Sequence, residues 1–189
     1  MAKTPKKKIM TAREMNLASA RVAAEIVERH VDRTPFALIG IRRRGVPLAE
    51  RLKKQIENLA GISIEMGTLD ITLYRDDLST IAPNPVVEGS LIQFKVEDKI
   101  IILVDDVLYT GRTVRAALDS LIDYGRPKAV ELAVLIDRGH RELPIQADFV
   151  GKYVDTADDE VIEVRLPEVD NEECVYLVTR QQLEAGATE

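Results

Sequence analysis

One segment carries more information than any other: Ile101-Ile102-Leu103-Val104-Asp105-Asp106-Val107-Leu108-Tyr109-Thr110-Gly111-Arg112-Thr113. Its four leading aliphatic residues are typical of a strand that is buried on both faces, as in a parallel sheet. Two acids follow at the carboxyl end of that strand, where open α/β sheets bind their ligands. The turn 110–113 then opens a helical pattern and offers backbone N–H groups and a helix N-terminus to an anion. The segment therefore predicts a site for a ligand with both hydroxyls and a phosphate, such as a sugar phosphate.

Two common phosphate-binding motifs do not match this segment. The Gly–Lys–Ser/Thr ending of the Walker loop is absent, and so are the spaced glycines of the dinucleotide fingerprint. The simplest alternative is an ordinary strand–helix turn whose acids lie in solvent. Two acids and a phosphate-shaped turn within nine residues favour the binding site over that alternative.

Strand, turn and helix patterns recur along the chain, which indicates βαβ units and an α/β fold with a mostly parallel sheet flanked by helices. Residues 36–41 predict a buried strand, and Pro47 suits the first turn of a following helix. Thr11 and Glu14 form a capping-box pattern before a helix that runs to about Glu28. The inward-facing helical residues are expected to include Leu48, Leu52, Ile56 and Leu59, and later Val114, Leu118, Leu121 and Ile122. The other expected strands are 62–74, 130–136, 147–151, 161–166 and 175–179.

The 189 residues fit a single domain, 1–189. Residues 1–10 are expected to form a basic tail, and residues 180–189 a loose C-terminus. Residues from about 70 to 99 form a turn-rich insertion punctuated by Pro83 and Pro85, and such insertions are usually functional or disordered.

Composition narrows the class of protein. A net charge of −6 argues against broad, unspecific affinity for nucleic acid, although a local basic face is still compatible with it. One cysteine excludes an internal disulfide, and with only two histidines a structural zinc site is improbable. No apolar run reaches membrane-spanning length, and no apolar signal core follows the basic N-terminus. We therefore expect a cytoplasmic protein without a membrane partner.

The segment Asp105–Thr113 resembles the phosphoribosyl-pyrophosphate (PRPP) motif of type I phosphoribosyltransferases. Its amino-acid sequence is similar to that of one family in particular, the bifunctional pyrimidine-operon attenuation regulators and uracil phosphoribosyltransferases. The resemblance extends from about Thr11 to Thr179. It implies the type I phosphoribosyltransferase fold, in which residues 70–99 would be a flexible hood over the site. It also implies a reaction in which uracil and PRPP, with Mg²⁺, give UMP and pyrophosphate.

The resemblance assigns roles to the motif. Asp105 and Asp106 would be the catalytic pair, holding the ribose hydroxyls and balancing a cationic sugar, and either carboxylate could assist proton removal from the base. Mg²⁺ would be held mainly through PRPP, with no protein ligand assigned to it. The motif residues expected to contact substrate after the acids are Val107, Leu108, Tyr109, Thr110, Gly111, Arg112 and Thr113.

Three adjacent arginines, residues 42–44, lie between a buried strand and Pro47. Like charges in a tight loop repel, so an anion or solvent has to compensate them. A solvated basic turn is the plain alternative. The resemblance implies instead that Arg43 and Arg44 bind the departing diphosphate, with Gly45 allowing a close backbone approach.

Further substrate contacts are implied outside these two loops. Tyr74 and Arg75 belong to the expected hood, and Arg75 would reach the diphosphate or, alternatively, pair with Asp76 or Asp77 at the surface. Arg138 would contact the nucleotide or base, and Ile162 would read the base edge through its backbone.

Members of the resembling family that bind messenger RNA use a basic, hydroxyl-bearing face that includes the first helix. At the matching positions this chain has Leu17, Ala20 and Ala24, whose side chains donate no hydrogen bond. The residues left to form an RNA-binding surface are Arg21, Arg138, His140 and Arg141.

We therefore expect a uracil phosphoribosyltransferase that is also a UMP-responsive regulator binding the leader RNA of a pyrimidine operon. The alternatives are an RNA-binding attenuator with little catalytic activity and a purine-type phosphoribosyltransferase. The family likeness also suggests a homo-oligomer, a dimer or larger.

Overall fold

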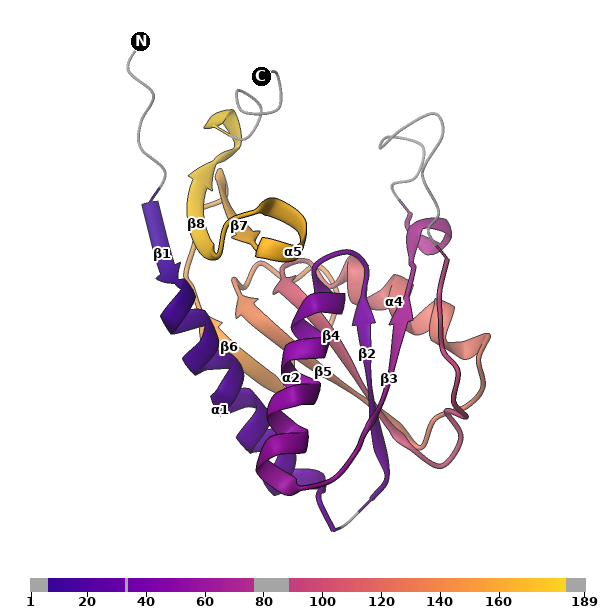
Figure 1. The fold of residues 1–189 in the computed structure, drawn as a ribbon. Coiled ribbons are helices and arrows are strands. Elements are labelled where there is room, and N and C mark those ends of the chain that lie inside the picture. Colours follow the sequence, from indigo (N-terminus) through magenta and orange to yellow (C-terminus); the bar gives the residue numbers. More distant parts are fainter. Residues whose placement is uncertain (1–6, 33, 77–88, 183–189) are drawn as a thin grey trace.

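A five-stranded parallel sheet forms the centre of the molecule in the computed structural model, which describes residues 7–32, 34–76 and 89–182 (Figure 1). The strand order is β3-β2-β4-β5-β6. The strands are β2 (Phe36–Ile41), β3 (Glu65–Leu69), β4 (Ile100–Leu108), β5 (Ala129–Asp137) and β6 (Phe149–Tyr153). All four neighbouring pairs are parallel, so the carboxyl ends of the strands meet at one edge.

Helices cover both faces of this sheet. Helices α1 (Ala12–His30) and α2 (Gly45–Ala60) lie on one face, and α4 (Arg112–Ile122) lies on the other. Strand β4 supplies both layers of the core, because Ile102 packs with α1 and α2 whereas Ile101 packs with α4. This alternation explains the unbroken aliphatic run and confirms the predicted α/β class.

The helix boundaries follow local signals. Thr11 caps α1, accepting a hydrogen bond from the Glu14 N–H at 3.3 Å while the Glu14 carboxylate accepts one from the Thr11 N–H at 2.8 Å. Leu59 and Ile122 were predicted wrongly as core residues, since they are 59% and 70% exposed. Both lie in the last turn of their helices, beyond the final residues that pack on the sheet.

A second, three-stranded antiparallel sheet stands above the carboxyl edge of the central sheet (Figure 1). Its order is β1-β8-β7, formed by β1 (Lys7–Thr11), β8 (Cys174–Thr179) and β7 (Glu160–Arg165). The short helix α5 (Pro167–Asp170) leads from β7 to β8. The prediction of a basic tail was wrong for residues 7–10, because they pair with β8 and bury Met10.

The expected hood and the C-terminus lie partly outside the described residues. The predicted strand 62–74 is replaced by β3 and a 3₁₀ turn, η1 (Thr72–Tyr74). Residues 77–88 are not described, and from residue 89 the chain returns to the sheet, where Leu91 bridges to Thr68. Residues 180–182 add one helical turn after β8, while 183–189 also lie outside the described part.

Candidate active site

Asp105 and Asp106 lie near the carboxyl end of β4, at the carboxyl edge of the sheet. Strand β4 continues through them to Leu108, so they belong to the strand rather than following it. The Asp105 residue is only 7% exposed, and its Oδ1 accepts a hydrogen bond from the Asp106 N–H at 2.9 Å. The Asp106 Oδ1 accepts one from the Val107 N–H at the same distance. These local bonds fix both carboxylates beside the turn that follows.

The electrostatics of this pair call for a cation or a hydroxyl-bearing ligand. Burial, and then the charge of Asp106, raises the pKa of Asp105 well above its usual value. Burial also raises the pKa of Asp106. Arg75 acts in the opposite direction on Asp105, as Arg44 does on Asp106. The buried Asp105 and the half-buried Asp106 are thus brought together with two arginines, each from a different loop.

A cavity of about 280 Å³ opens directly after the acids. It is lined by residues 107–114 of the motif together with Arg75 and Asp76. Gly111 has a φ of 92° and is the N-cap of α4, a conformation that favours glycine. The first turn of α4 therefore borders this cavity, an arrangement that suits an anion. The structure brings the predicted residues from Val107 to Thr113 together around this single cavity.

Arg112 pairs with two acids, Glu142 and the cavity-lining Asp76. Its Nε donates to Glu142 Oε2 at 2.6 Å and its Nη1 to Asp76 Oδ2 at 2.7 Å. Arg115 also pairs with Asp76, at 3.3 Å. The Arg112 guanidinium is therefore largely neutralised, and its backbone N–H donates to Thr110 Oγ1 at 3.3 Å within the turn.

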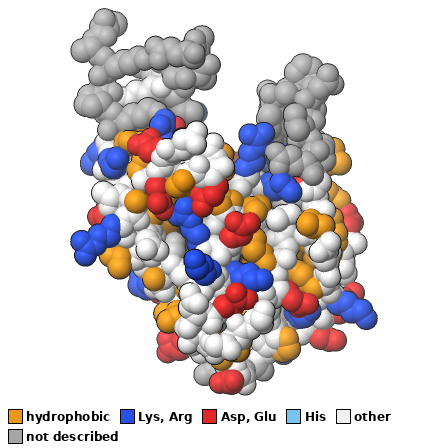
Figure 2. Space-filling view, viewed as in Figure 1, with side chains coloured by type: hydrophobic (Ala, Val, Ile, Leu, Met, Phe, Trp, Pro, Cys, Tyr) orange, Lys and Arg blue, Asp and Glu red, His pale blue; other side chains and the backbone are white. Residues whose placement is uncertain are grey.

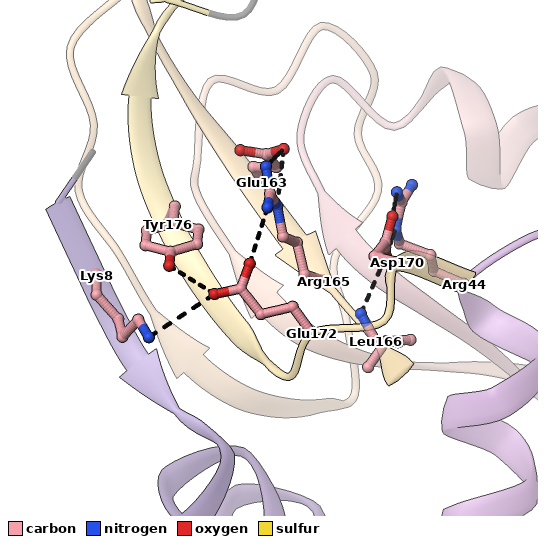
Figure 3. A network of polar contacts seen from close by, with 8 residues as sticks. All are labelled: Lys8, Arg44, Glu163, Arg165, Leu166, Asp170, Glu172 and Tyr176. Atoms are coloured by element: carbon pink, nitrogen blue, oxygen red, sulfur yellow. Dashed lines mark hydrogen bonds and ion pairs between the residues drawn. The ribbon is translucent and has the colours of Figure 1, made fainter. Parts of the chain in front are cut away.

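The arginine turn lies between β2 and α2, beside the acids. Arg43 is exposed, and the Arg42–Arg43 peptide bond is cis. Arg44 donates from Nε and Nη2 to the two carboxylate oxygens of Asp170, at 3.1 and 2.7 Å (Figure 3). Gly45 is buried against β4, where an added Cβ would collide with the Val104 carbonyl oxygen. The close backbone approach expected of Gly45 is therefore made to the strand that carries the acids.

Tyr74 and Arg75, the substrate contacts expected from the hood, are both described, but only Arg75 lines the cavity. Arg75 lines the cavity, and its charge acts on Asp105. The Tyr74 hydroxyl hydrogen-bonds the Asp123 carboxylate beyond the end of α4, which turns its polar end toward the helix. Asp76, one alternative surface partner of Arg75, is bound by Arg112 and Arg115, and the other, Asp77, lies outside the described residues.

Arg138 connects the central sheet to the second sheet. It is 4% exposed, its guanidinium lies 4.1 Å from the centre of the Tyr109 ring, and its Nη2 donates to the Glu160 carbonyl at 2.6 Å. Burial lowers its pKa. Ile162, 7% exposed, lies in β7 two residues after Glu160. Arg138, which directly follows β5, and Ile162 of β7 are the two residues expected to meet the base. They therefore come from the two different sheets.

The side chains expected to bind RNA make hydrogen bonds within the protein. Arg21 donates to the carbonyls of Val150 and Gly151, at 3.1 and 2.5 Å, along the edge of β6. His140 hydrogen-bonds the Thr156 carbonyl at 2.7 Å. Arg141 donates to the Tyr109 carbonyl at 2.8 Å and so stabilises the backbone of the turn 109–113.

Further contacts of these residues reinforce that picture. Arg141 also donates to the carbonyls of Gly139 and Ile145 and to the Asp137 carboxylate. Leu17 is 61% exposed on α1, so an apolar residue stands where the resembling family has polar ones. Figure 2 shows basic and acidic side chains interleaved on the face it presents.

Sequence reasoning missed Asp170, the partner of Arg44, and the Glu160 carbonyl that holds Arg138. Both partners lie far along the chain from the arginines that they bind, and no local pattern marks them. Among residues 7–32, 34–76 and 89–182, no three His, Cys, Asp or Glu side chains gather as metal ligands. In the same part of the chain no helix has the length and apolar character needed to cross a bilayer.

Comparison with known proteins places this geometry in context. Residues 6–169 match the family described as "Phosphoribosyl transferase domain". The chain is 59% identical over 158 residues to the "Bifunctional protein PyrR" of Pelotomaculum thermopropionicum, covering 84% of this chain and 87% of that relative. It is 52% identical over 180 residues to the protein of the same name from Deinococcus radiodurans, covering 95% and 98%.

Solved structures agree with these relatives on the fold. A hypoxanthine phosphoribosyltransferase from Staphylococcus aureus superposes with a TM-score of 0.70 at 19% identity, covering 96% of this chain and 99% of its own. The Trypanosoma cruzi hypoxanthine phosphoribosyltransferase in complex with IMP gives 0.71 at 15% identity, covering 96% and 98%. At these identities the likeness supports the fold alone.

Proposed function

Because the chain belongs to the phosphoribosyl transferase family, and within it to the bifunctional pyrimidine-operon regulators and uracil phosphoribosyltransferases, we propose that the edge described above is its catalytic site. There uracil displaces pyrophosphate from C1 of PRPP to give UMP. One observation carries the proposal: the adjacent acids at 105 and 106, the first of them buried, directly precede a turn and helix N-terminus that surround one cavity. A ribose 5-phosphate likewise carries hydroxyls on one side of the sugar and a phosphate on the other.

The chemistry requires orientation and electrostatics more than covalent help. As the C1–oxygen bond lengthens, positive charge grows on the sugar and negative charge on the departing diphosphate. Asp105 and Asp106 hold the hydroxyls and balance the sugar. The turn 109–113 anchors the 5′-phosphate through backbone N–H groups, and Arg44 with Arg43 receives the diphosphate.

Arg75 and Arg138 complete the proposed site. Arg75 stands over the cavity and reaches the diphosphate from the side of the hood, whose closure would exclude water. Arg138, stacked on Tyr109, positions the base, and the Ile162 backbone reads its edge. The ring-nitrogen proton of uracil leaves during the attack, and a carboxylate of the acid pair is the nearest acceptor in this scheme.

The acids also fit the magnesium ion that this class of enzyme generally uses with PRPP. Two adjacent carboxylates whose pKa values are raised by burial lack part of their compensating positive charge. Hard oxygen donors of this kind suit Mg²⁺ when substrate oxygens complete its coordination. The metal, when bound, would neutralise charge on the diphosphate.

Regulation is the second proposed activity, with UMP as co-effector and a pyrimidine-operon leader RNA as partner. Membership of the bifunctional family supports it. The exposed Leu17 and the internal bonds of Arg21 and Arg141 mean that any RNA contact on these faces relies on other atoms or on rearrangement. The proposal includes a cytoplasmic location and a homo-oligomer.

The catalytic proposal is tested by UMP formation from labelled uracil, PRPP and Mg²⁺, beside a panel containing hypoxanthine and guanine. We expect turnover with uracil and none with hypoxanthine or guanine. A folded protein that turns over only the purines would refute the uracil assignment. Regulation is tested by gel shift with the leader RNA and a scrambled RNA, each with and without UMP. Equal, steeply salt-dependent binding to both RNAs would refute it.

A further inference from the structure

The pair formed by Arg44 and Asp170 connects the arginine turn to the second sheet (Figure 3). The contact is side-on: Nε and Nη2 each donate to a different carboxylate oxygen, so two bonds fix the plane of the guanidinium. The Asp170 bond raises the pKa of Arg44. Burial opposes the effect on Asp170, yet the bond from Arg44 contributes to keeping its pKa low. Both partners therefore stay charged at neutral pH.

The side-on contact occupies only one edge of the guanidinium. Among the described residues no hydrogen bond uses Nη1 of Arg44, and the second Nη2 hydrogen points along that same outer edge. The charge of Arg44 reaches Asp106, whose pKa it lowers. A fork of donors is thus held ready near the acid pair, in the geometry that suits a diphosphate.

Asp170 is itself fixed before any ligand arrives. Its Oδ2 accepts the Leu166 N–H at 3.0 Å, and its own N–H donates to the Leu166 carbonyl at 2.6 Å. The neighbouring Glu168 pairs with Arg51 of α2 at 2.9 Å, which anchors α5 against that helix. A hollow of about 470 Å³ separates α5 from the exposed side of the arginine turn. Asp170 therefore belongs to a rigid support and not to a mobile surface.

We propose that Asp170 is a positioning residue for PRPP: it holds the inner edge of the Arg44 guanidinium so that the outer edge meets the diphosphate beside Asp106. The inference rests on the proposed function, because it takes the diphosphate as the ligand of Arg44. It adds a residue of α5, the short helix between β7 and β8, to the machinery that orients the leaving group.

The test uses Asp170→Asn, whose amide oxygen can still accept the Leu166 N–H while the negative charge is lost. The matched control is Glu168→Gln in the same helix, which weakens a pair with Arg51 and does not touch Arg44. We expect Asp170→Asn to raise the KM for PRPP about tenfold and to weaken inhibition by pyrophosphate similarly. The KM for uracil and the thermal midpoint should stay near those of the control.

A double-mutant cycle separates positioning from a general structural role. In an Arg44→Gln background, Asp170→Asn should add no further loss in the KM for PRPP. Independent, additive losses would overturn the proposal, as would an unchanged or lowered KM in Asp170→Asn alone. A lowered KM would mean that Asp170 competes with the diphosphate.

Calorimetry with Mg²⁺–PRPP and with pyrophosphate distinguishes this inference from the function on which it rests. If the wild-type protein forms UMP but Asp170→Asn binds both ligands normally, only the positioning role fails. If the wild-type protein forms no UMP yet binds PRPP, a weaker affinity in Asp170→Asn still supports positioning. If it binds neither ligand, both proposals fall together.

Discussion

Replacing Gly45 by alanine should damage both the stability of the fold and the binding of PRPP. Gly45 begins α2 and packs on β4 at the residue before the acid pair. A Cβ there would collide with the Val104 carbonyl oxygen and lie 3.2 Å from its carbonyl carbon and 3.3 Å from the Asp105 Cα. All three are backbone atoms in the central strand of the sheet, so no side-chain rotation relieves the contact.

The expected cost lies at the upper end of the range for overpacking, about 3 kcal/mol, because the backbone has to move. For a domain of this size that corresponds to a fall in the thermal midpoint of roughly 6–12 °C. Because the displaced atoms include Asp105, we also expect a higher KM for PRPP. Small misplacements of orienting groups can cost on the order of a hundredfold in activity.

The matched control is Gly61→Ala at the other end of α2. Gly61 has a φ of 66° and nothing within 4 Å of an added Cβ, so only the backbone strain of about 1 kcal/mol is expected. Thermal unfolding and initial rates at varied PRPP measure both variants. A Gly45→Ala protein that melts with the wild type, or melts lower with unchanged PRPP kinetics, would refute the link between this contact and the acids.

Two further predictions concern charge. Since burial raises the pKa of Asp105, folding favours its protonated form, and the free energy of unfolding falls as pH rises from the ordinary aspartate pKa through the raised one. Asp105→Asn should therefore melt higher than wild type at about pH 8 but not at about pH 3, without ligands, while UMP formation drops; parallel melting curves at both pH values would contradict this. Arg112→Gln should raise the KM for PRPP only a few-fold, because Asp76 and Glu142 already bind that guanidinium. A loss comparable to that of the acid variant would show a direct phosphate contact.

The sequence was sufficient where structure depends on local or periodic patterns. The run Ile101–Val104 predicted a strand buried on both faces, and its residues do alternate between the two core layers. The capping box at Thr11 marked the start of α1 correctly. The residues expected to cradle a phosphate are contiguous in the chain, so their meeting around one cavity required no long-range information.

The sequence was insufficient where a partner lies far along the chain. Residues 7–10 are two lysines followed by Ile9 and Met10, a segment too short to show a strand pattern, and only their pairing with β8 makes them a strand. Arg141 was assigned to an RNA-binding surface, and in the structure its Nη1 donates to the carbonyls of Tyr109 and Gly139. Composition reveals a basic side chain, whereas the carbonyls that it meets depend on the fold. For the same reason, Asp170 gave no signal as the partner of Arg44.

The pairing of β1 with β8 has a consequence for synthesis of the protein. Lys7–Thr11 leaves the ribosome before the central sheet, and its partner strand Cys174–Thr179 follows only after the whole central sheet has emerged. The α/β unit can begin to fold before β1 pairs with β8, because contacts between residues so far apart in the sequence form late. An interrupted nascent chain that ended before α5 would carry the acids and the turn 109–113 without Asp170, the partner that fixes the plane of the Arg44 guanidinium.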